Sequence, residues 1–270
     1  FNGAAFLSEA IQSILGQTFE EFEFIIINDG STDATRQMLS DFEKRDDRIR
    51  AYHHQNKGRA ASLNNGIRLA RGRYIARMDA DDVSIPDRLK LQSEFMQQHP
   101  EVAVLGGAVD VIDSAGAKLY TVSPPTDDPG IREVLRSYNL LYHSSIIFRK
   151  DVFDIVHGYR QQFLDADDYD LWLRMAEEGD LATLTQVVVR YRIHPEQVSS
   201  RGLKRQMECV LAARVAASAR RVSGVDPMSD IQTITSEVLL ANGISASILE
   251  HALLDTYWAW IRILLRASEP

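Results

Sequence analysis

Three carboxylates lie within four residues in the segment Asp79-Ala80-Asp81-Asp82. Ionised carboxylates this close repel one another, and a divalent cation would relieve the repulsion. Oxygen-only ligation favours Mg²⁺ or Mn²⁺, and proteins commonly share Mg²⁺ between one or two carboxylates and the phosphates of a substrate. In an extended chain Asp79 and Asp81 point to one side and Asp82 to the other. The segment therefore predicts either a metal site built on Asp79 and Asp81 or a solvated acidic turn.

A second polar cluster, 28–33, directly follows an apolar, strand-like run. Its Asp29 is able to accept hydrogen bonds from a nucleotide base or from ribose, and ligand contact is our preferred interpretation. The Ser, Thr and Asp at 31–33 are instead typical of residues that cap a helix. The Lys-Gly-Arg segment at 57–59 has the composition of a helix start that binds phosphate, although a solvated loop would look the same.

Four aspartates crowd the segment from Asp165 to Asp170. The helix dipole stabilises carboxylates at a helix start by ~0.3–1 kcal/mol each, which explains one or two of the four. An ionised carboxylate held there is also able to take a proton from a hydroxyl group, as a general base does. His143 and His194 each have two interpretations, a structural role and contact with a metal or a phosphate.

Helix-like and strand-like segments alternate through the front half of the chain and position these clusters. Helical periodicity is found at 4–15, 34–45, 59–70 and 86–98, and strand-like runs at 22–27, 49–53 and 74–78. This alternation is typical of a mostly parallel sheet covered by helices, where ligands bind beyond the carboxyl ends of the strands. The clusters at 28–33 and 79–82 both follow strands, so we expect them at one rim.

The rest of the chain divides into an irregular middle and a helical tail. The middle has strand-like runs at 102–112, 145–149 and 186–191 and helical ones at 130–138 and 165–178. We expect one domain over 1–200 and a helical extension over 201–270. In the extension, Trp258, Trp260, Ile261 and Leu264 form an apolar stripe that suits a membrane surface, or packing on the core, which is the simpler interpretation.

Composition and charge exclude several classes of protein. The 270 residues are 45% hydrophobic and carry a net charge of −8, which indicates a folded chain with a sizeable core and argues against broad nucleic-acid binding. The single cysteine, Cys209, has no intrachain partner, which fits a reducing compartment. We find no apolar run of ~18 residues, so we expect no transmembrane span. The chain starts at Phe1 without a signal peptide or Met, so we expect a truncated start.

Taken together, these segments resemble the family 2 glycosyltransferases of the GT-A fold, over about residues 1–200. Each motif is weak alone, but their order and spacing are specific. The matching pieces are FNG at 1–3, FLSEAI at 6–11, IINDGSTD at 26–33, NKG at 56–58, ASLNNGI at 61–67, ARMDADD at 76–82, Pro86 with RL at 88–89, DDYDLWLR at 167–174 and YRIH at 191–194.

The resemblance implies an α/β fold with a GT-A-type (Rossmann-like), mostly parallel sheet flanked by helices and a C-terminal helical extension. It implies inverting transfer of a sugar from a nucleoside-diphosphate sugar, with a UDP-sugar expected, to a hydroxyl of a glycan or lipid-linked acceptor. Mg²⁺ or Mn²⁺ is the implied cofactor. The implied process is polysaccharide biosynthesis in the cytoplasm, with the tail covering the acceptor side, joining subunits of a homo-oligomer or touching the inner face of the membrane. The family's first apolar strand, central in the sheet, would precede Phe1, so we expect it to be missing or replaced.

The resemblance also implies roles for single residues. The donor and metal roles are Asp29 on the base, Lys57 near the phosphates, Asp79 near the ribose or sugar, Asp81 on the metal, and His194 on the metal or diphosphate. Asp168 falls at the position of the catalytic base. Asp167 stands where the family usually has Glu, which leaves open which of the two carboxylates acts.

Three rival hypotheses remain at this point. A nucleotidyltransferase usually needs an early Gly-rich phosphate loop, and we find none. A non-catalytic module that only binds a sugar nucleotide would not need the intact acidic set. In the third, the chain is a scaffold whose C-terminal helices carry the function.

Overall fold

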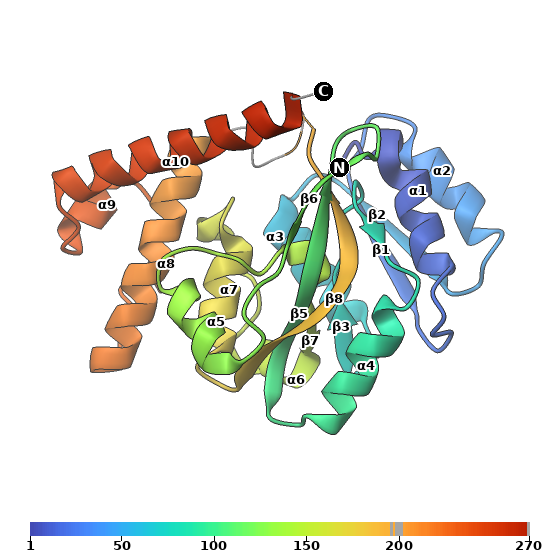
Figure 1. Ribbon diagram of the computed structural model, residues 1–270, viewed down its shortest axis with the longest axis horizontal. Coiled ribbons are helices and arrows are strands. Elements are labelled where there is room, and N and C mark those ends of the chain that lie inside the picture. The colour runs from blue at the N-terminus through green and yellow to red at the C-terminus, as the bar shows by residue number, and fades with distance from the viewer. Residues whose placement is uncertain (195–196, 198–201, 269–270) are drawn as a thin grey trace.

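The computed structural model describes residues 1–194, 197 and 202–268, with side chains as far as Trp258 (Figure 1). The chain has the α/β architecture that the sequence predicts, in which helices cover β-sheets. Strands β1 and β2 form a small sheet, and six further strands form a larger one. Among the described strands no hydrogen-bonded ladder joins β1 to β3, so the two sheets are separate.

The small sheet is parallel and has helices on both faces. Its layer consists of β1 (Phe24–Asp29), β2 (Ile49–His54), α1 (Ala4–Leu15), α2 (Thr35–Glu43) and α3 (Arg59–Leu69). Leu7 of α1 and Leu39 of α2 pack with Ile26 on one face. On the other face α3 approaches closely at Gly66, where an added Cβ would lie 3.1 Å from the side chain of Ile27. Apolar contacts on both faces explain the unbroken apolar run of β1.

The larger sheet is mixed and holds the longest strands. In spatial order it contains β3 (Tyr74–Ala76), β7 (Ile147–Arg149), β5 (Val102–Ile112), β8 (Asp180–Arg192) and β4 (Val83–Ser84), with β6 (Lys118–Val122) also paired to β5. β5 and β8 are parallel, and the other ladders of this sheet are antiparallel. β5 is buried along nearly all its length, which makes it the centre of the fold.

Helices cover the larger sheet from opposite sides. They are α4 (Arg88–Gln98), α5 (Asp128–Leu135), α6 (Lys150–Ile155) and α7 (Asp167–Met175), and α4 lies across the sheet from α7 (Figure 1). Successive residues of β5 point to opposite faces of the sheet. Val104 packs in the hydrophobic cluster that contains Trp172 of α7, and Leu105 packs in the hydrophobic cluster that contains Met96 of α4. This alternation is the two-residue period of a strand.

The C-terminal helices share the core of the preceding domain. The extension contains α8 (Leu203–Ser223), α9 (Ser236–Ala241) and α10 (Ala246–Ser268). Leu211 and Ala212 of α8 and Leu253 of α10 pack in the same hydrophobic cluster as Trp172. Trp258 is 58% exposed, while Trp260, Ile261 and Leu264 lie outside the described side chains. In the described part of the chain, no helix combines the length and apolar character needed to cross a membrane.

Most boundaries predicted for the front half lie within two or three residues of the observed ones, and α1 matches over 4–15. α4 begins at Arg88 because the chain still turns at Pro86, whose carbonyl accepts the amide of Thr18 at 2.9 Å. The sequence does not predict β6 or α6. The mixed sequence of β6, with no buried residue, shows no clear hydrophobic period, and α6 is too short to show one. β8 extends well ahead of its predicted start at 186.

We predict that Trp172→Ala lowers the free energy of unfolding by about 3–5 kcal/mol, because a fully buried ring would leave a cavity. The matched control is Trp258→Ala, which should change it by less than about 0.5 kcal/mol, since that ring is exposed. Urea unfolding followed by circular dichroism measures both. Equal effects of the two substitutions would contradict the described core.

Candidate active site

The acidic cluster forms where the chain turns between β3 and β4. Asp79, Asp81 and Asp82 each bring a carboxylate oxygen within 4.8 Å of the other two. The expectation that Asp82 points away from Asp79 and Asp81 is wrong, because residues 80 and 81 form a turn and the chain is not extended there. All three carboxylates therefore face one small volume.

Asp79 is held by its neighbours on two sides. The Arg77 guanidinium pairs with both of its carboxylate oxygens, and Ser144 donates to one of them at 3.2 Å. The Ser144 hydroxyl also accepts the backbone N–H of Asp79 at 3.0 Å. Burial acts to raise the pKa of Asp79, but Arg77 outweighs it, so this pKa is lowered and the carboxylate stays ionised.

Asp81 lies beside His194, with 3.0 Å between its Oδ2 and the Nε2 of the imidazole. Burial and the charge of Asp79 raise the pKa of Asp81, and contact with His194 opposes that rise. The structure thus brings together the two residues that the sequence assigned to a metal. His194 is positioned either to donate to Asp81 or to share a cation with it.

Asp82 is the most buried of the three carboxylates, at 1% exposure. Its Oδ1 accepts the backbone N–H of Arg192 at 2.8 Å, whereas its Oδ2 has no hydrogen-bond partner in the described chain. Burial and the charges of Asp79 and Asp81 raise its pKa well above the usual value. An orphaned buried oxygen and mutual repulsion are what a bound cation would correct, so the donor set fits Mg²⁺ or Mn²⁺.

Asp29 organises the loop that precedes α3. Its two oxygens accept the backbone N–H groups of Lys57 at 2.7 Å and Gly58 at 3.0 Å, and His54 lies 3.2 Å away. These two amides are therefore not available to a phosphate. The side chain of Lys57 is exposed and could still bind a phosphate at this loop.

The N-cap expected at Ser31 or Thr32 is wrong, because α2 begins only at Thr35, and the Ser31 hydroxyl and one oxygen of Asp33 instead accept N–H groups at the N-terminus of α1. The Ser31 hydroxyl accepts the N–H of Asn2 at 2.8 Å, and Asp33 accepts that of Ala4 at 3.1 Å. The other oxygen of Asp33 accepts the N–H of Thr35, the first residue of α2, at 3.0 Å, so Asp33 stabilises this helix start as expected. The N-termini of α1 and α2 are thus joined by this loop.

Three of the four aspartates at the start of α7 have an arginine partner. The pairs are Asp165 with Arg205, Asp167 with Arg59, and Asp170 with Arg160 and Arg174. Asp165 also has a positive φ of 73°, so the helix starts two residues later than its predicted position. Of these four aspartates, only Asp168 has no cationic hydrogen-bond partner among the described residues.

Asp168 is held by neutral donors. Asn139 donates to its Oδ2 at 2.9 Å, and the backbone N–H of Tyr169 donates to its Oδ1 at 2.7 Å. Burial and the charge of Asp167 raise the pKa of Asp168 to about 6. Near neutral pH this carboxylate is mostly ionised yet basic enough to accept a proton, which suits a general base.

A segment between α5 and β7, residues 139–144, connects the base to the acidic cluster. Asn139 contacts Asp168, and Ser144 contacts Asp79. Between them, burial lowers the pKa of His143 well below its usual value, and its Nε2 lies 2.7 Å from the Tyr159 hydroxyl, so His143 is structural. No sequence pattern indicates a role for Asn139 or Ser144, because their partners lie 29 and 65 residues away.

Comparison with known proteins assigns the family. The model of glycosyl transferase family 2 matches residues 1–156. The chain belongs to this family. It is 36% identical over 183 residues to the putative glycosyltransferase EpsE of Bacillus subtilis (66% of this chain, 65% of EpsE), and 32% identical over 198 residues to the O-antigen biosynthesis glycosyltransferase WbnJ of Escherichia coli (72% and 77%). The chain spans less than two thirds of the length of several curated relatives, EpsE included.

Solved structures share the GT-A fold with this chain. The S. aureus TarS structure with UDP-GlcNAc has a TM-score of 0.65 at 16% identity, over 81% of this chain and 64% of that one. The mannosyltransferase PcManGT of Pyrobaculum calidifontis, in complex with GDP-Man and Mn²⁺, has a TM-score of 0.60 at 17% identity, over 100% and 74%. The GT-A fold predicted from the motifs is confirmed. The expectation of a mostly parallel sheet is wrong for the larger sheet, where four of the five described ladders are antiparallel, because the direction of pairing depends on contacts between distant strands.

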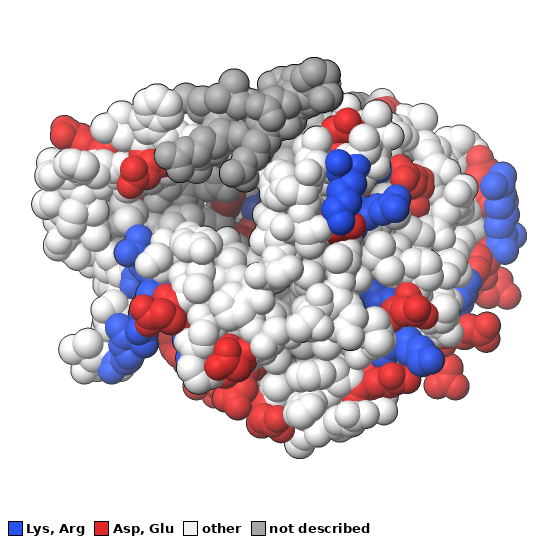
Figure 2. Space-filling view, in the orientation of Figure 1, with Lys and Arg blue, Asp and Glu red and all other residues white. Residues whose placement is uncertain are grey.

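Acidic and basic side chains are interspersed over the face drawn in Figure 2, and neither sign forms a broad patch on it. Long-range electrostatic attraction of a charged ligand to this face is therefore weak.

We predict that Mn²⁺ raises the melting temperature of the protein and that Asp81→Ala abolishes most of this increase, since the ion binds the folded state through the acidic cluster. Differential scanning fluorimetry across a Mn²⁺ series measures it, with EDTA as the reverse step. The exposed Asp47 supplies the control Asp47→Ala, which should respond like the unaltered protein. An identical Mn²⁺ response in Asp81→Ala would contradict the metal site.

Proposed function

We propose that this glycosyltransferase moves a sugar from a nucleoside-diphosphate sugar to a hydroxyl of a glycan or lipid-linked acceptor, with inversion at the anomeric carbon. The observation that carries the proposal is Asp168, a half-buried carboxylate without a cationic hydrogen-bond partner among the described residues, connected through the 139–144 segment to a cluster of three carboxylates. One part supplies a base and the other a site for a diphosphate. Sugar transfer between a diphosphate and a hydroxyl needs both.

The donor is proposed to lie along the rim from Asp29 to Asp81. Asp29 would contact the base, Lys57 the phosphates and Asp79 the ribose or sugar. Asp81, with Asp82 and His194 beside it, would hold Mg²⁺ or Mn²⁺, whose charge would stabilise the leaving diphosphate. TarS was solved with UDP-GlcNAc and PcManGT with GDP-Man, which supports a nucleotide-sugar donor. Of uracil and guanine, we propose uracil as the base of the donor, which is therefore a UDP-sugar.

Asp168 is proposed to act as the base in a single displacement. The acceptor oxygen attacks the anomeric carbon as the bond to the diphosphate breaks, and Asp168 takes the hydroxyl proton. The transition state is oxocarbenium-like, as in inverting glycosidases, and no covalent enzyme intermediate forms. Arg59 neutralises Asp167, so that of the two adjacent carboxylates Asp168 is the one left to act. This pairing supports Asp168 over Asp167, the choice that the Asp-for-Glu change left open.

Several finer assignments extend this proposal. The name of WbnJ associates that relative with O-antigen biosynthesis, which supports a role in polysaccharide assembly. Family membership favours sugar transfer over nucleotidyl transfer. The shared core of α8 with the domain is against an independent function of the tail. Cytoplasmic location, contact of the tail with the membrane and subunit association through it stay predictions.

We predict that Asp168→Asn lowers kcat by about 10²–10⁴-fold, because the amide cannot take the acceptor proton. The Kd for UDP with Mn²⁺ should stay within about two-fold, which calorimetry measures alongside UDP release from a panel of UDP-sugars. The control is Asp154→Asn, because the side chain of Asp154 in α6 is 58% exposed and has no part in the proposed site. Near-normal turnover in Asp168→Asn would contradict the base assignment.

We predict that kcat/KM rises with pH through about 6, because Asp168 must lose its proton to act and its pKa is raised to about 6. Removing the negative charge of Asp167 should lower this pKa, so Asp167→Asn should move the acidic limb to lower pH. Profiles of kcat/KM from pH 4.5 to 8 locate the acidic limb in the unaltered protein and in Asp167→Asn. Each protein is first shown to stay folded over this range. An acidic limb at the same pH in both proteins would exclude Asp168 as its origin.

A further inference from the structure

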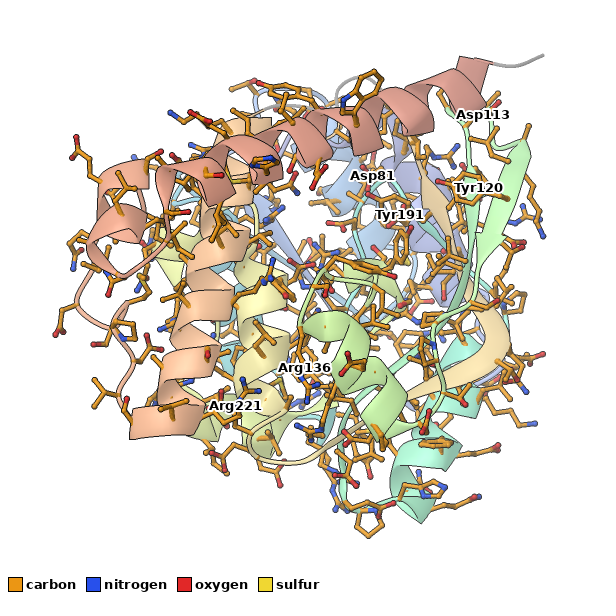
Figure 3. All side chains as sticks on the ribbon, turned by 60° about the vertical axis from the view of Figure 1, so that its left-hand side comes forward. Asp81, Asp113, Tyr120, Arg136, Tyr191 and Arg221 are labelled. Carbon is orange, nitrogen blue, oxygen red and sulfur yellow. The ribbon has the colours of Figure 1, made fainter. Side chains whose placement is uncertain are left out.

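A pocket of about 600 Å³ lies between the C-terminal helices and the rest of the chain. Its walls come from the end of α5, from α7, from α8 and from α10. Figure 3 shows Arg136, at the end of α5, and Arg221 of α8 below α10 and apart from Asp81. None of the residues that we assign to the donor or to the base lines this pocket, so it is a second site.

One face of α8 forms the longest wall of the pocket. Leu211, Arg214, Val215, Ser218 and Arg221 all line it, and they recur at intervals of three or four residues. This spacing places them in one stripe along the helix. Apolar and cationic side chains therefore alternate on a single wall.

Positive charge predominates in the pocket. Its lining contains three arginines, at 136, 214 and 221, and one carboxylate, Asp255. Arg136 pairs with Glu133 at the surface, but Arg214 and Arg221 have no side-chain hydrogen bond or salt bridge within the described part of the chain. Two guanidinium groups that face a partly apolar space without a counter-charge attract an anion.

The apolar part of the lining continues onto the outer surface. Leu173 of α7 and Ile248 of α10 lie in the pocket. Leu254 and Trp258 follow His251 of the pocket by three and seven residues, so they lie on the adjoining face of α10, and each is 58% exposed. An exposed apolar strip thus leads out of the pocket along this helix.

A lipid with a phosphate headgroup matches both properties. Guanidinium groups bind phosphate oxygens, and an acyl chain packs on the apolar wall and strip. A nucleotide also carries phosphate, but the described lining has no Phe, Tyr or Trp on which a base would stack. An extended acidic peptide would need free backbone groups, and helical walls use theirs internally. The volume lies within the range of small-molecule sites, ~300–1,000 Å³.

We propose that this pocket binds the phosphate headgroup of an anionic membrane lipid. Arg214, Arg221 and Arg136 hold the phosphate, and the acyl chain leaves along Leu254 and Trp258. The inference goes beyond sugar transfer, because it requires neither Asp168 nor the acidic cluster. The bound lipid fixes this side of α10 at a membrane surface, where leucine and tryptophan side chains are stabilised.

The test is flotation of the full chain with vesicles of phosphatidylcholine, alone or with about 20 mol% phosphatidic acid, at physiological ionic strength. We expect at least about five-fold stronger partitioning to the vesicles that contain phosphatidic acid. Arg214→Gln/Arg221→Gln should lower that partitioning at least about ten-fold, since it removes two cations from the site. The matched control is Arg36→Gln/Arg68→Gln, which removes two exposed arginines of α2 and α3 and should change it less than about two-fold.

Calorimetry with soluble probes separates a lipid site from a site for free phosphate. Dihexanoyl phosphatidic acid should bind the unaltered protein more tightly than inorganic phosphate or dihexanoyl phosphatidylcholine does. Ser218→Trp fills the pocket without changing its charge, so it should also weaken binding of the phosphatidic acid. Equal affinity for inorganic phosphate, or full affinity in Ser218→Trp, would overturn the proposal in favour of simple anion attraction.

Two further results distinguish this site from the transferase site and from a contact between subunits. Asp81→Ala and Asp168→Asn should bind the vesicles like the unaltered protein, so a failed transferase proposal leaves this test valid. Circular dichroism confirms that each variant is folded. No preference for phosphatidic acid, equal losses in the two arginine double variants, or a dimer that dissociates in Arg214→Gln/Arg221→Gln would refute the lipid site.

Discussion

Repulsion among three clustered carboxylates, one buried and two half-buried, is the constraint on which the acidic turn depends. Asp79, Asp81 and Asp82 share a volume too small for three unopposed charges, and only Asp79 has a paired guanidinium, from Arg77. The pKa values of the other two are raised as a result. A site of this kind is costly for the fold unless a cation completes it, and it is thereby prepared to bind one together with an anionic ligand.

The same reasoning distinguishes the carboxylates at the start of α7. An arginine neutralises Asp167, whereas amide donors hold Asp168 and leave it basic. Two adjacent residues of one type thus differ in role because their partners differ. Those partners come from α3 and from the 139–144 segment, so donor loop, base and acidic turn are assembled as one unit around the larger sheet.

The C-terminal helices contribute to this unit from the outside. α8 packs in the core that also holds Trp172, five residues after Asp167 on α7, and it therefore supports the helix that carries Asp168. The boundary expected near residue 200 does not separate two cores. The sequence predicts a separate helical extension here, because the apolar residues of a helix do not show which other surface they pack against.

The sequence by itself determined most of the strands and helices and the acidic turn, and its family motifs singled out Asp29, Asp168 and His194 as candidates, because local periodicity and short motifs depend on neighbouring residues. The tertiary structure alone decided that Asp82 joins the acidic cluster, that Asp29 binds the amides before α3, and that Asn139, Ser144 and Arg59 belong to the site. It also set the antiparallel ladders of the larger sheet and the pocket between α5, α8 and α10. These features depend on contacts between residues far apart in the chain, and pairing at that distance leaves no periodic trace in a single sequence.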